Sequence, residues 1–293
     1  MKACQPILER QGSARTPGPP SLRDSGHVQD RYAGDLGDYL TFGLLRWLVP
    51  PGSPAVPRLG VVWYRTADEA HNADGKHVAY LDPQHRSSAG LRQLDPDLYA
   101  RLASVVRSGQ RNTAALAGAG ALSGGTRFFG DLLDFSDLPV AARAARQARR
   151  RSWLERALAA TADCDLIFAD PDNGIRSALH PVPAHRTKAV KHAYLDELVA
   201  FARRGQSLIV YQHADRSAAV EQQAHRRLAD FAREVPITPI GAVRASRGSS
   251  RLFLVGAASG SHARYLTERL ARLDRSSWAR ELVGIGLGSG RST

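Results

Sequence analysis

The feature that most constrains the fold is the alternation of short apolar runs with helical patterns in the second half of the chain. Apolar runs cover residues 165–169 (DLIFA) and 207–211 (SLIVY), and helical periodicity precedes them at 140–161 and 191–204. Short apolar strands separated by helices are typical of a parallel sheet that is covered on both faces. The alternation therefore predicts an α/β domain.

Patterns elsewhere in the chain are compatible with this sheet. Helices are expected within 32–49 and at 95–107, 111–118, 216–233 and 261–273, and strands at 59–64 and 126–130, with a short extended piece at 78–81. Residues 237–245 and 250–257 form a hairpin-like pair that would supply an antiparallel edge strand near the C-terminus. We therefore expect a Rossmann-like, mostly parallel sheet with helices on both faces.

The ends of the chain differ in composition from its middle. Residues 1–28 are rich in Pro, Gly, Ser and Arg without periodicity, which predicts a disordered leader, and residues 284–293 predict a flexible tail. Residues 29–283 are then a single domain.

Cysteine content and hydropathy exclude several classes of protein. Only Cys4 and Cys164 are present, so neither a disulfide framework nor a cysteine zinc site can form, and Cys164 is expected to be a small core residue. Residues 1–26 lack the continuous apolar core expected of a secretory signal, and no apolar run approaches the roughly 20 residues that cross a bilayer. We expect a cytoplasmic protein without a membrane partner, whose oligomeric state the sequence leaves open.

The charge balance favours a polyanionic partner. Lys and Arg number 40 against 28 Asp and Glu, which gives a net charge of +12, and the pI is about 10.4. The densest basic stretch, which includes Arg149, Arg150 and Arg151, falls in a predicted helix, and Arg216 follows a later strand. These four arginines are candidate nucleic-acid contacts, although a solvated helix face would have the same sequence.

Polar residues directly follow the strand at 165–169. Asp170, Asp172 and Asn173 lie there, with Pro171 to stiffen the turn and Gly174 to permit an unusual backbone angle. Ligands of open α/β sheets bind at the carboxyl ends of strands, which favours a catalytic role for these residues over a plain turn.

Two further polar clusters are candidates. His213 follows the strand at 207–211 and is a possible acid or base, although a lone histidine is equally well a cap or a core residue. Asp35 and Asp38 alternate with Gly34 and Gly37 at the first helix, where Asp38 would be the N-cap.

The loop after Tyr64 occupies the place of a cofactor-binding turn if the strand at 59–64 is the first of the sheet. The loop contains neither GxGxxG nor GxxxxGK[ST]. The sequence therefore does not favour a nicotinamide or flavin site, and it has no P-loop motif.

Two segments resemble the class I S-adenosylmethionine-dependent methyltransferases, in particular the ribosomal-RNA adenine-N6 and DPPY-type branch. Residues 33–38 (AGDLGD) are similar to that branch's N-terminal AGNxADxxKHxxL element, and Asp170-Pro171 is similar to the start of DPPY. The chain departs from the pattern at Asp172 and Asn173, which replace the Pro and the aromatic that stacks on a flipped base. The segments GDxGDY, DPDNG and VYQH also resemble an uncharacterised bacterial family.

The resemblance implies an enzyme that uses S-adenosylmethionine to methylate a nucleic acid or nucleotide-like substrate. Asp170 would hold the target amino group, and the cofactor would lie near Asp35, Asp38, Tyr64 and Asp131.

Two alternatives remain open. In a metal-dependent phosphodiesterase or nuclease, Asp35, Asp170 and Asp172 would hold Mg²⁺ or Mn²⁺, since these hard ions prefer oxygen ligands. In a non-catalytic domain, the sheet would bind nucleic acid without any reaction.

Overall fold

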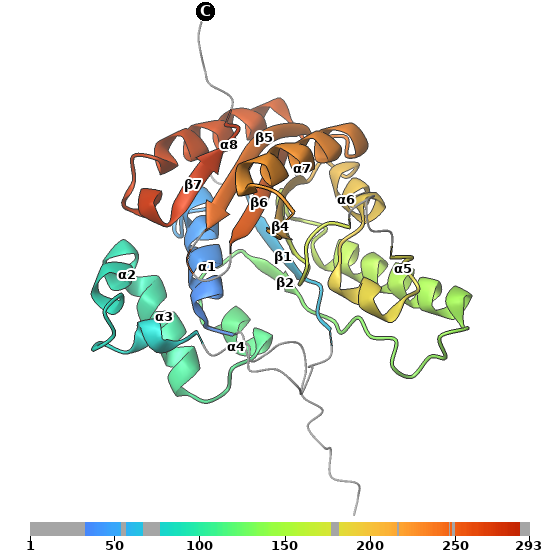
Figure 1. Cartoon of the computed structure of the whole chain (residues 1–293), viewed down its shortest axis with the longest axis horizontal. Coiled ribbons are helices and arrows are strands. Elements are labelled where there is room, and N and C mark those ends of the chain that lie inside the picture. The colour runs from blue at the N-terminus through green and yellow to red at the C-terminus, as the bar shows by residue number, and fades with distance from the viewer. Residues whose placement is uncertain are drawn as a thin grey trace, which may run out of the picture.

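A computed structural model describes residues 33–53, 57–66, 77–176, 182–215, 217–245, 247 and 250–287. The leader predicted at 1–28 and most of the loop after Tyr64 lie outside these residues. The described part is an α/β fold built on one sheet of seven strands, with helices on both sides of it (Figure 1). The prediction of the fold class is confirmed at this level.

The sheet is mixed, with strand order β2-β1-β3-β4-β6-β5-β7. The strands, in chain order, are β1 (Leu59–Trp63), β2 (Arg127–Phe129), β3 (Leu166–Asp170), β4 (Ser207–His213), β5 (Thr238–Ala245), β6 (Arg251–Ala257) and β7 (Leu282–Ile285). β2, β1, β3 and β4 are parallel neighbours. β6 pairs in antiparallel fashion with both β4 and β5, and β7 does so with β5.

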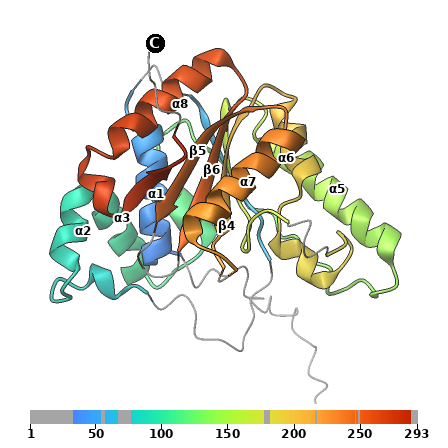
Figure 2. The same cartoon turned by 45° about the horizontal axis from the view of Figure 1, so that its top comes forward.

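One face of the sheet is covered by α1 (Leu36–Leu48) and α8 (Gly260–Leu273). Their apolar residues share a core with alternate residues of the strands, among them Leu166, Phe168 and Phe253. Helices α2 (Ser88–Leu94), α3 (Pro96–Arg107) and α4 (Thr113–Gly118) extend this layer outward from α1. In Figure 2, α1 and α8 lie to the left of the strands.

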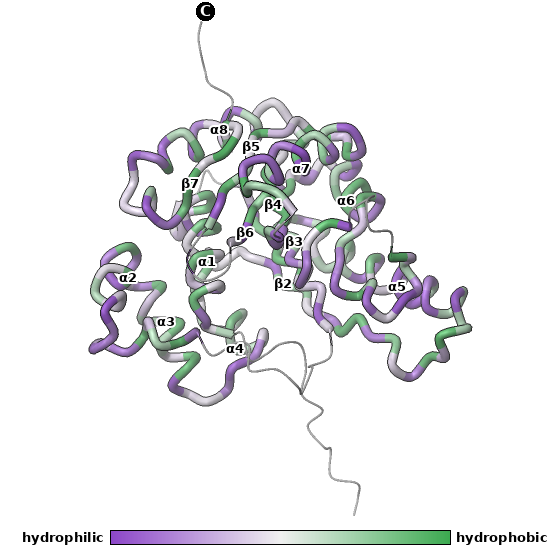
Figure 3. The backbone as a smooth tube through the Cα atoms, viewed as in Figure 1, coloured by the Kyte–Doolittle hydropathy of each residue, from purple (hydrophilic) through white to green (hydrophobic). Residues whose placement is uncertain are grey.

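The opposite face is covered by α5 (Arg143–Ala160), α6 (Leu195–Ala202) and α7 (Val220–Glu234). The other alternate strand residues, such as Ile167 and Ala169, pack there against Trp153 of α5 and Phe231 of α7. Figure 3 colours the central strands largely as hydrophobic and much of the outer helices as hydrophilic. Each strand of the centre is therefore apolar on both faces, because helices exclude water from both.

Several predicted elements differ from the observed ones. Residues 79–81 form a 3₁₀ turn rather than an extended piece, and the short helix α2 was not predicted. The helix predicted at 191–204 is shorter, since a 3₁₀ turn occupies Thr187–Lys191 and α6 begins only at Leu195. These are elements of one or two turns, for which tertiary contacts outweigh the local pattern.

The C-terminal end of the sheet also differs from the prediction. The hairpin of β5 and β6 exists, but its antiparallel strand β6 lies inside the sheet between β4 and β5. The edge strand is β7, which crosses the predicted boundary between the domain and the tail at residue 283. Leu282 and Ile285 have opposite parity and are buried in the cores on opposite faces of the sheet, whereas Val283 is exposed.

Two predictions from composition can be compared with the described residues. Cys164 is a buried free thiol in the core on the α5 side, as predicted. Within the described ranges, no helix has the length and apolar character needed to cross a membrane.

Candidate active site

The start of α1 is built by two aspartates that cap it. Asp35 is the N-cap residue, and its side chain accepts a hydrogen bond from the backbone N–H of Asp38 at 3.0 Å. Asp38 lies in the first turn and accepts from the N–H of Gly34 at 2.8 Å. The prediction that Asp38 is the N-cap is therefore wrong, because the helix begins one turn earlier. Gly34 has a φ of +79°, which a residue with a side chain rarely adopts.

Buried aromatic residues hold this helix start in place. The hydroxyl of Tyr80 donates to the backbone oxygen of Gly34 at 3.1 Å, and its ring contacts the rings of Tyr39 and Tyr99. The N–H of Leu36 donates to the backbone oxygen of His77 at 3.1 Å. The two aspartates are thus fixed by the core rather than carried on a loose loop.

Asp170 is the last residue of β3, at the carboxyl end of the parallel strands. It is paired in register with Trp63 of β1. Its side chain shares a face with Leu166 and Phe168, which pack in the α1 layer. Asp170 therefore points toward the side of the sheet on which α1 begins.

Arg251 lies at the same end of the sheet as Asp170, although its strand, β6, runs in the opposite direction. It is the first residue of β6, and because β6 is antiparallel to β4, it is paired with His213 at the carboxyl end of β4. A Cβ atom at Gly37 would lie 2.6 Å from the Nη2 atom of Arg251 and 2.9 Å from the Oδ1 atom of Asp35. Gly37 therefore leaves the space that the guanidinium fills beside the carboxylates.

Sequence reasoning missed Arg251, although a signal was available. In the run SRLFLVGA, Arg251 has the same parity as Phe253 and Val255, which are buried in the α1 layer. A charged residue in register with an inward-facing apolar set is a candidate for a buried or half-buried role.

The carboxylates of α1 are affected by burial and by each other. Burial raises the pKa of Asp35, while the N–H groups of Asp38 and Gly37 and the charge of Arg251 oppose that rise. Burial raises the pKa of Asp38 further, and the charge of Asp35 adds to it. Asp170 also raises the pKa of Asp38, so the three carboxylates belong to one electrostatic group, which we call the acidic cluster.

Asp170 has the property expected of a group that exchanges protons near neutral pH. Burial, with the charges of Asp172 and Asp35, raises its pKa to about 7, and Arg251 acts in the opposite direction. A carboxyl group with this pKa can accept or donate a proton at physiological pH. The side chain is partly exposed and so is accessible to a ligand.

The turn after Asp170 has a structural component. The N–H of Ile175 donates to the side-chain oxygen of Gln212 at 2.9 Å, and Gly174 has a φ of +90°. A Cβ atom at Gly174 would lie 2.6 Å from the Gln212 side chain, which explains the glycine. Gln212 therefore fixes the turn, and its role is structural.

The other two polar residues of this turn lie on its outer side. Asp172 is partly exposed, and its carboxylate is 3.3 Å from the Nζ atom of Lys191. Asn173 is exposed, and its backbone N–H donates to the oxygen of Lys191 at 2.9 Å. Only Asp172 acts electrostatically on the acidic cluster, through Asp170.

His213 lies at the border of the cluster. Its Nδ1 atom is 3.3 Å from the hydroxyl of Tyr211, and its side chain is exposed. Burial raises the pKa of Tyr211, Arg251 opposes this rise, and Asp170 and Asp172 add to it. The hydroxyl of Tyr211 thus lies within electrostatic reach of Asp170.

Two residues predicted near the cofactor lie apart from the acidic cluster. Tyr64 has the parity of Val62, so its ring packs against Trp153 of α5, on the face opposite to the side chain of Asp170. The carboxylate of Asp131 pairs with Arg156 of α5 at 2.6 Å. The structure does not bring either side chain to Asp170.

The basic helix α5 differs from the predicted nucleic-acid surface. Arg150 is buried and pairs with Glu197 of α6 at 2.6 Å, so it is not available to a partner. Arg149 pairs with Asp137, and Arg151 is exposed. The helical spacing that suggested one cationic face in fact turns Arg150 toward the core. Arg216 lies outside the described residues.

Among the described residues, no three acidic, histidine or cysteine side chains are arranged to hold a metal ion. In the acidic cluster, the guanidinium of Arg251 stands beside the carboxylates where a cation would otherwise be attracted. The segment 67–76, in which a cofactor-binding turn was expected, is not among the described residues.

Comparison with known proteins gives no relative from which a function could be transferred: no protein-family model matches the chain, and no curated protein matches it.

Proposed function

We propose that this chain is a Rossmann-like, S-adenosylmethionine-dependent methyltransferase that acts on an amino group of a nucleic acid or nucleotide-like substrate. The strand arrangement supports the proposal, because the parallel run β2-β1-β3-β4 is followed by an antiparallel strand, β6, inserted before β5. The resembling methyltransferases have an antiparallel last strand, and here the last strand, β7, also runs antiparallel to its neighbour β5.

The observation that carries the proposal is the acidic cluster at the carboxyl ends of the parallel strands. Asp35 and Asp38 come from the start of α1 and Asp170 from the end of β3, which are the two segments on which the resemblance rests. Their mutual influence on pKa means that they lie close together. Segments about 130 residues apart in the chain thus contribute to one site.

The side chains present suit such a cofactor and substrate. Carboxylates attract a sulfonium cation and accept hydrogen bonds from an ammonium group or ribose hydroxyls, which gives Asp35 and Asp38 a role in binding. S-adenosylmethionine would supply the methyl group. Asp170 would accept a hydrogen bond from the substrate amine and take up its proton, since the pKa of Asp170 is about 7.

The departures from the DPPY pattern limit the substrate. Asp172 and Asn173 stand where an aromatic residue would stack on a flipped base, and Asp172 lies beside Lys191. Base stacking at this turn is therefore not part of the proposal. Polar recognition of the substrate by Asp172 and Lys191 takes its place.

Calorimetric titration with S-adenosylmethionine tests the proposal. We expect saturable micromolar binding that Asp35→Asn weakens by about tenfold, because asparagine keeps the helix cap but removes the charge. Asp131→Asn is the matched control, since Asp131 lies apart and pairs with Arg156. Its affinity should stay within about twofold of the wild type.

The same titration separates the metal-dependent alternative. Absence of S-adenosylmethionine binding, together with a Mg²⁺ or Mn²⁺ isotherm that Asp170→Asn and Asp172→Asn abolish, would replace the methyltransferase with a phosphodiesterase. Absence of both kinds of binding would leave a non-catalytic domain.

A further inference from the structure

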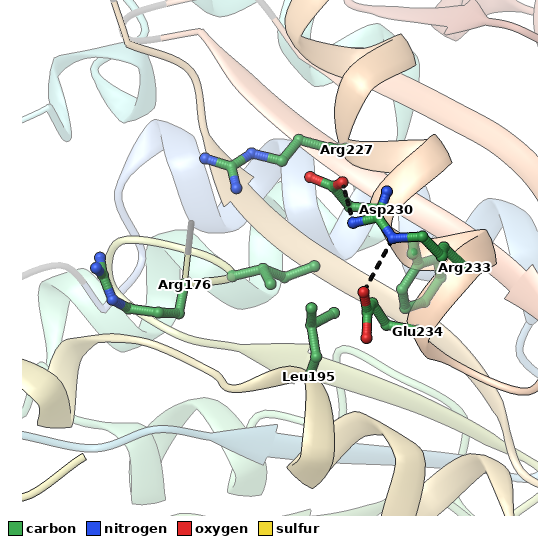
Figure 4. Close-up of a pocket in the computed structure, with 8 residues that line it drawn as sticks. Arg176, Leu195, Arg227, Asp230, Arg233 and Glu234 are labelled. Carbon is green, nitrogen blue, oxygen red and sulfur yellow. Dashed lines mark hydrogen bonds and ion pairs between the residues drawn. The ribbon is translucent and has the colours of Figure 1, made fainter. Parts of the chain in front are cut away.

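A pocket lies between α6 and α7, on the face of the sheet opposite to the acidic cluster. It has a volume of about 60 Å³ and is lined on its apolar side by Ile175, Leu195 and Phe231. Ile175 and Phe231 belong to the core of the α5–α7 layer, which makes this floor rigid. Figure 4 shows the charged side chains that surround it.

The charges around the pocket do not balance. Three arginines and two carboxylates line it. Arg233 uses both carboxylates, at 2.7 Å from Asp230 and 3.0 Å from Glu234. Figure 4 shows this paired group on one side, with the guanidiniums of Arg176 and Arg227 extending toward the other. Two cations therefore remain beside the pocket without a bonded carboxylate in the described structure.

Arg176 is a partly exposed residue, but two of its guanidinium nitrogens are buried and have no hydrogen-bond partner in the described part of the chain. Its Nε and Nη2 atoms are inaccessible to water and make no hydrogen bond within the described part of the chain. The segment is held by its backbone, because the N–H of Arg176 donates to the oxygen of Ala193 at 2.9 Å. Unmet, buried N–H donors of a cation are costly, so a rotation of this side chain that brings them to an anion in the pocket would be favourable.

Arg227 is close enough to Arg176 for the two charges to oppose each other. Burial lowers the pKa of Arg227, the charges of Asp230 and Asp215 oppose this, and the charges of Arg226 and then Arg176 add to the lowering. A bound anion would relieve both the repulsion and the burial cost.

We propose that this pocket is a phosphate-binding site in which the guanidiniums of Arg176 and Arg227 hold the anion. One guanidinium saturates the two oxygens of a carboxylate, whereas two guanidiniums match the several oxygens of a phosphate group. The site requires neither S-adenosylmethionine nor methyl transfer, so it goes beyond the proposed function. It would take a phosphate of a nucleotide or of a nucleic-acid strand.

The first test is a calorimetric titration of the full chain with inorganic phosphate. We expect saturable millimolar binding that Arg176→Gln and Arg227→Gln each weaken by about tenfold. The matched control is Arg264→Gln, which removes the same charge from an exposed position on α8, the helix that covers the other face of the sheet. Its affinity should change less than about twofold.

A second variant protects the test against loss of folding. Asp230→Asn removes a carboxylate that faces the site, so it should strengthen phosphate binding by about threefold, and thermal melting of every variant verifies that it is folded. Equal losses in the Arg264 and Arg227 variants, or unchanged affinity in the Asp230 variant, would overturn the site. So would the absence of saturable binding by the wild type.

The source of the phosphate follows from two further ligands. A nucleoside monophosphate and a short single-stranded oligonucleotide are titrated against the wild type and Arg227→Gln. Preference for the oligonucleotide that the variant loses assigns the site to a nucleic-acid backbone, and preference for the mononucleotide assigns it to a free nucleotide. Binding of neither ligand, with phosphate binding intact, would overturn the assignment to a substrate phosphate.

Discussion

Buried charge occurs in two regions of this protein, and the two regions treat it differently. Between α5 and α6, Arg150 and Glu197 form a pair in which Arg150 also donates to the backbone oxygens of Ala189 and His192, at 2.9 and 2.6 Å. At the start of α1, Asp35, Asp38 and Asp170 share the influence of one guanidinium, that of Arg251.

The difference separates a structural role from a chemical one. The cation between α5 and α6 has a carboxylate of its own, and its remaining N–H groups are used by the backbone. In the acidic cluster, carboxylates outnumber the cation, so at least one of them holds its proton to higher pH. An excess of one sign in a half-buried site is what acid-base chemistry requires, whereas a complete pair fixes the packing of two helices.

The largest effect is expected from breaking the complete pair. Glu197→Gln leaves Arg150 charged and buried without a counterion, which should lower the free energy of unfolding by about 3–5 kcal/mol, measured by urea denaturation. The double variant Arg150→Met/Glu197→Leu should recover much of this loss, because it removes both charges. A loss below about 1 kcal/mol in the single variant would mean that the pair is hydrated rather than buried.

An intermediate effect of opposite sign is expected in the acidic cluster. The folded pKa of Asp170 is about 7, above the value of about 3.8 that applies to the unfolded chain. The unfolded state therefore releases this proton first, and the contribution of Asp170 to stability, complete below pH 4, is lost as the pH rises through 7. Asp170→Asn should stabilise the protein by about 2 kcal/mol at pH 8 and should flatten the pH profile between pH 4 and 8.

The measurement is denaturant unfolding of both proteins across that pH range. Asp172→Asn is a useful companion, because removal of its charge lowers the pKa of Asp170 and should give a smaller change of the same sign. Identical pH profiles for the wild type and Asp170→Asn would contradict the assignment of the raised pKa to this residue.

The smallest effect is expected at an exposed pair. Asp131 and Arg156 are each about half exposed, at 48% and 50%. Asp131→Asn should change the free energy of unfolding by about 0.5 kcal/mol or less, and salt should remove the difference. If Asp131→Asn lowered the free energy of unfolding as much as Glu197→Gln does, solvent exposure would not explain the difference between the buried and the exposed ion pair.

The sequence was sufficient to predict the central strands and the location of Asp170, because an apolar run followed by DPDNG has both a strand signal and a turn signal. The sequence also indicated Asp35 and Asp38, because the neighbouring Gly34 and Gly37 are not needed for an ordinary helix start. The parity of Arg251 with Phe253 and Val255 indicates an inward-facing cation, but its position beside the aspartates depends on the antiparallel pairing of β6 with β4. That pairing is a long-range property that no local pattern encodes.

The failure at Arg150 has a different cause. Helical spacing tells which residues share a face, but the direction of that face depends on what the helix packs against. Arg150 and Trp153 both lie on the buried side of α5, and the Glu197 that receives Arg150 is on another helix, 47 residues away. Charge patterns alone cannot distinguish such a helix from one that faces solvent.

The reversal of β6 makes the charge balance of the acidic cluster a matter of strand alignment. Arg251 is opposite His213 only in the observed register. A slip of two residues between β6 and β4 would keep every inward side chain on its face, yet it would carry the guanidinium about 7 Å along the strand. The aspartates would then have no cation beside them, although none of them had moved. The alignment of β6 with β4 thus becomes a means of tuning the acidity of residues to which β6 is not bonded.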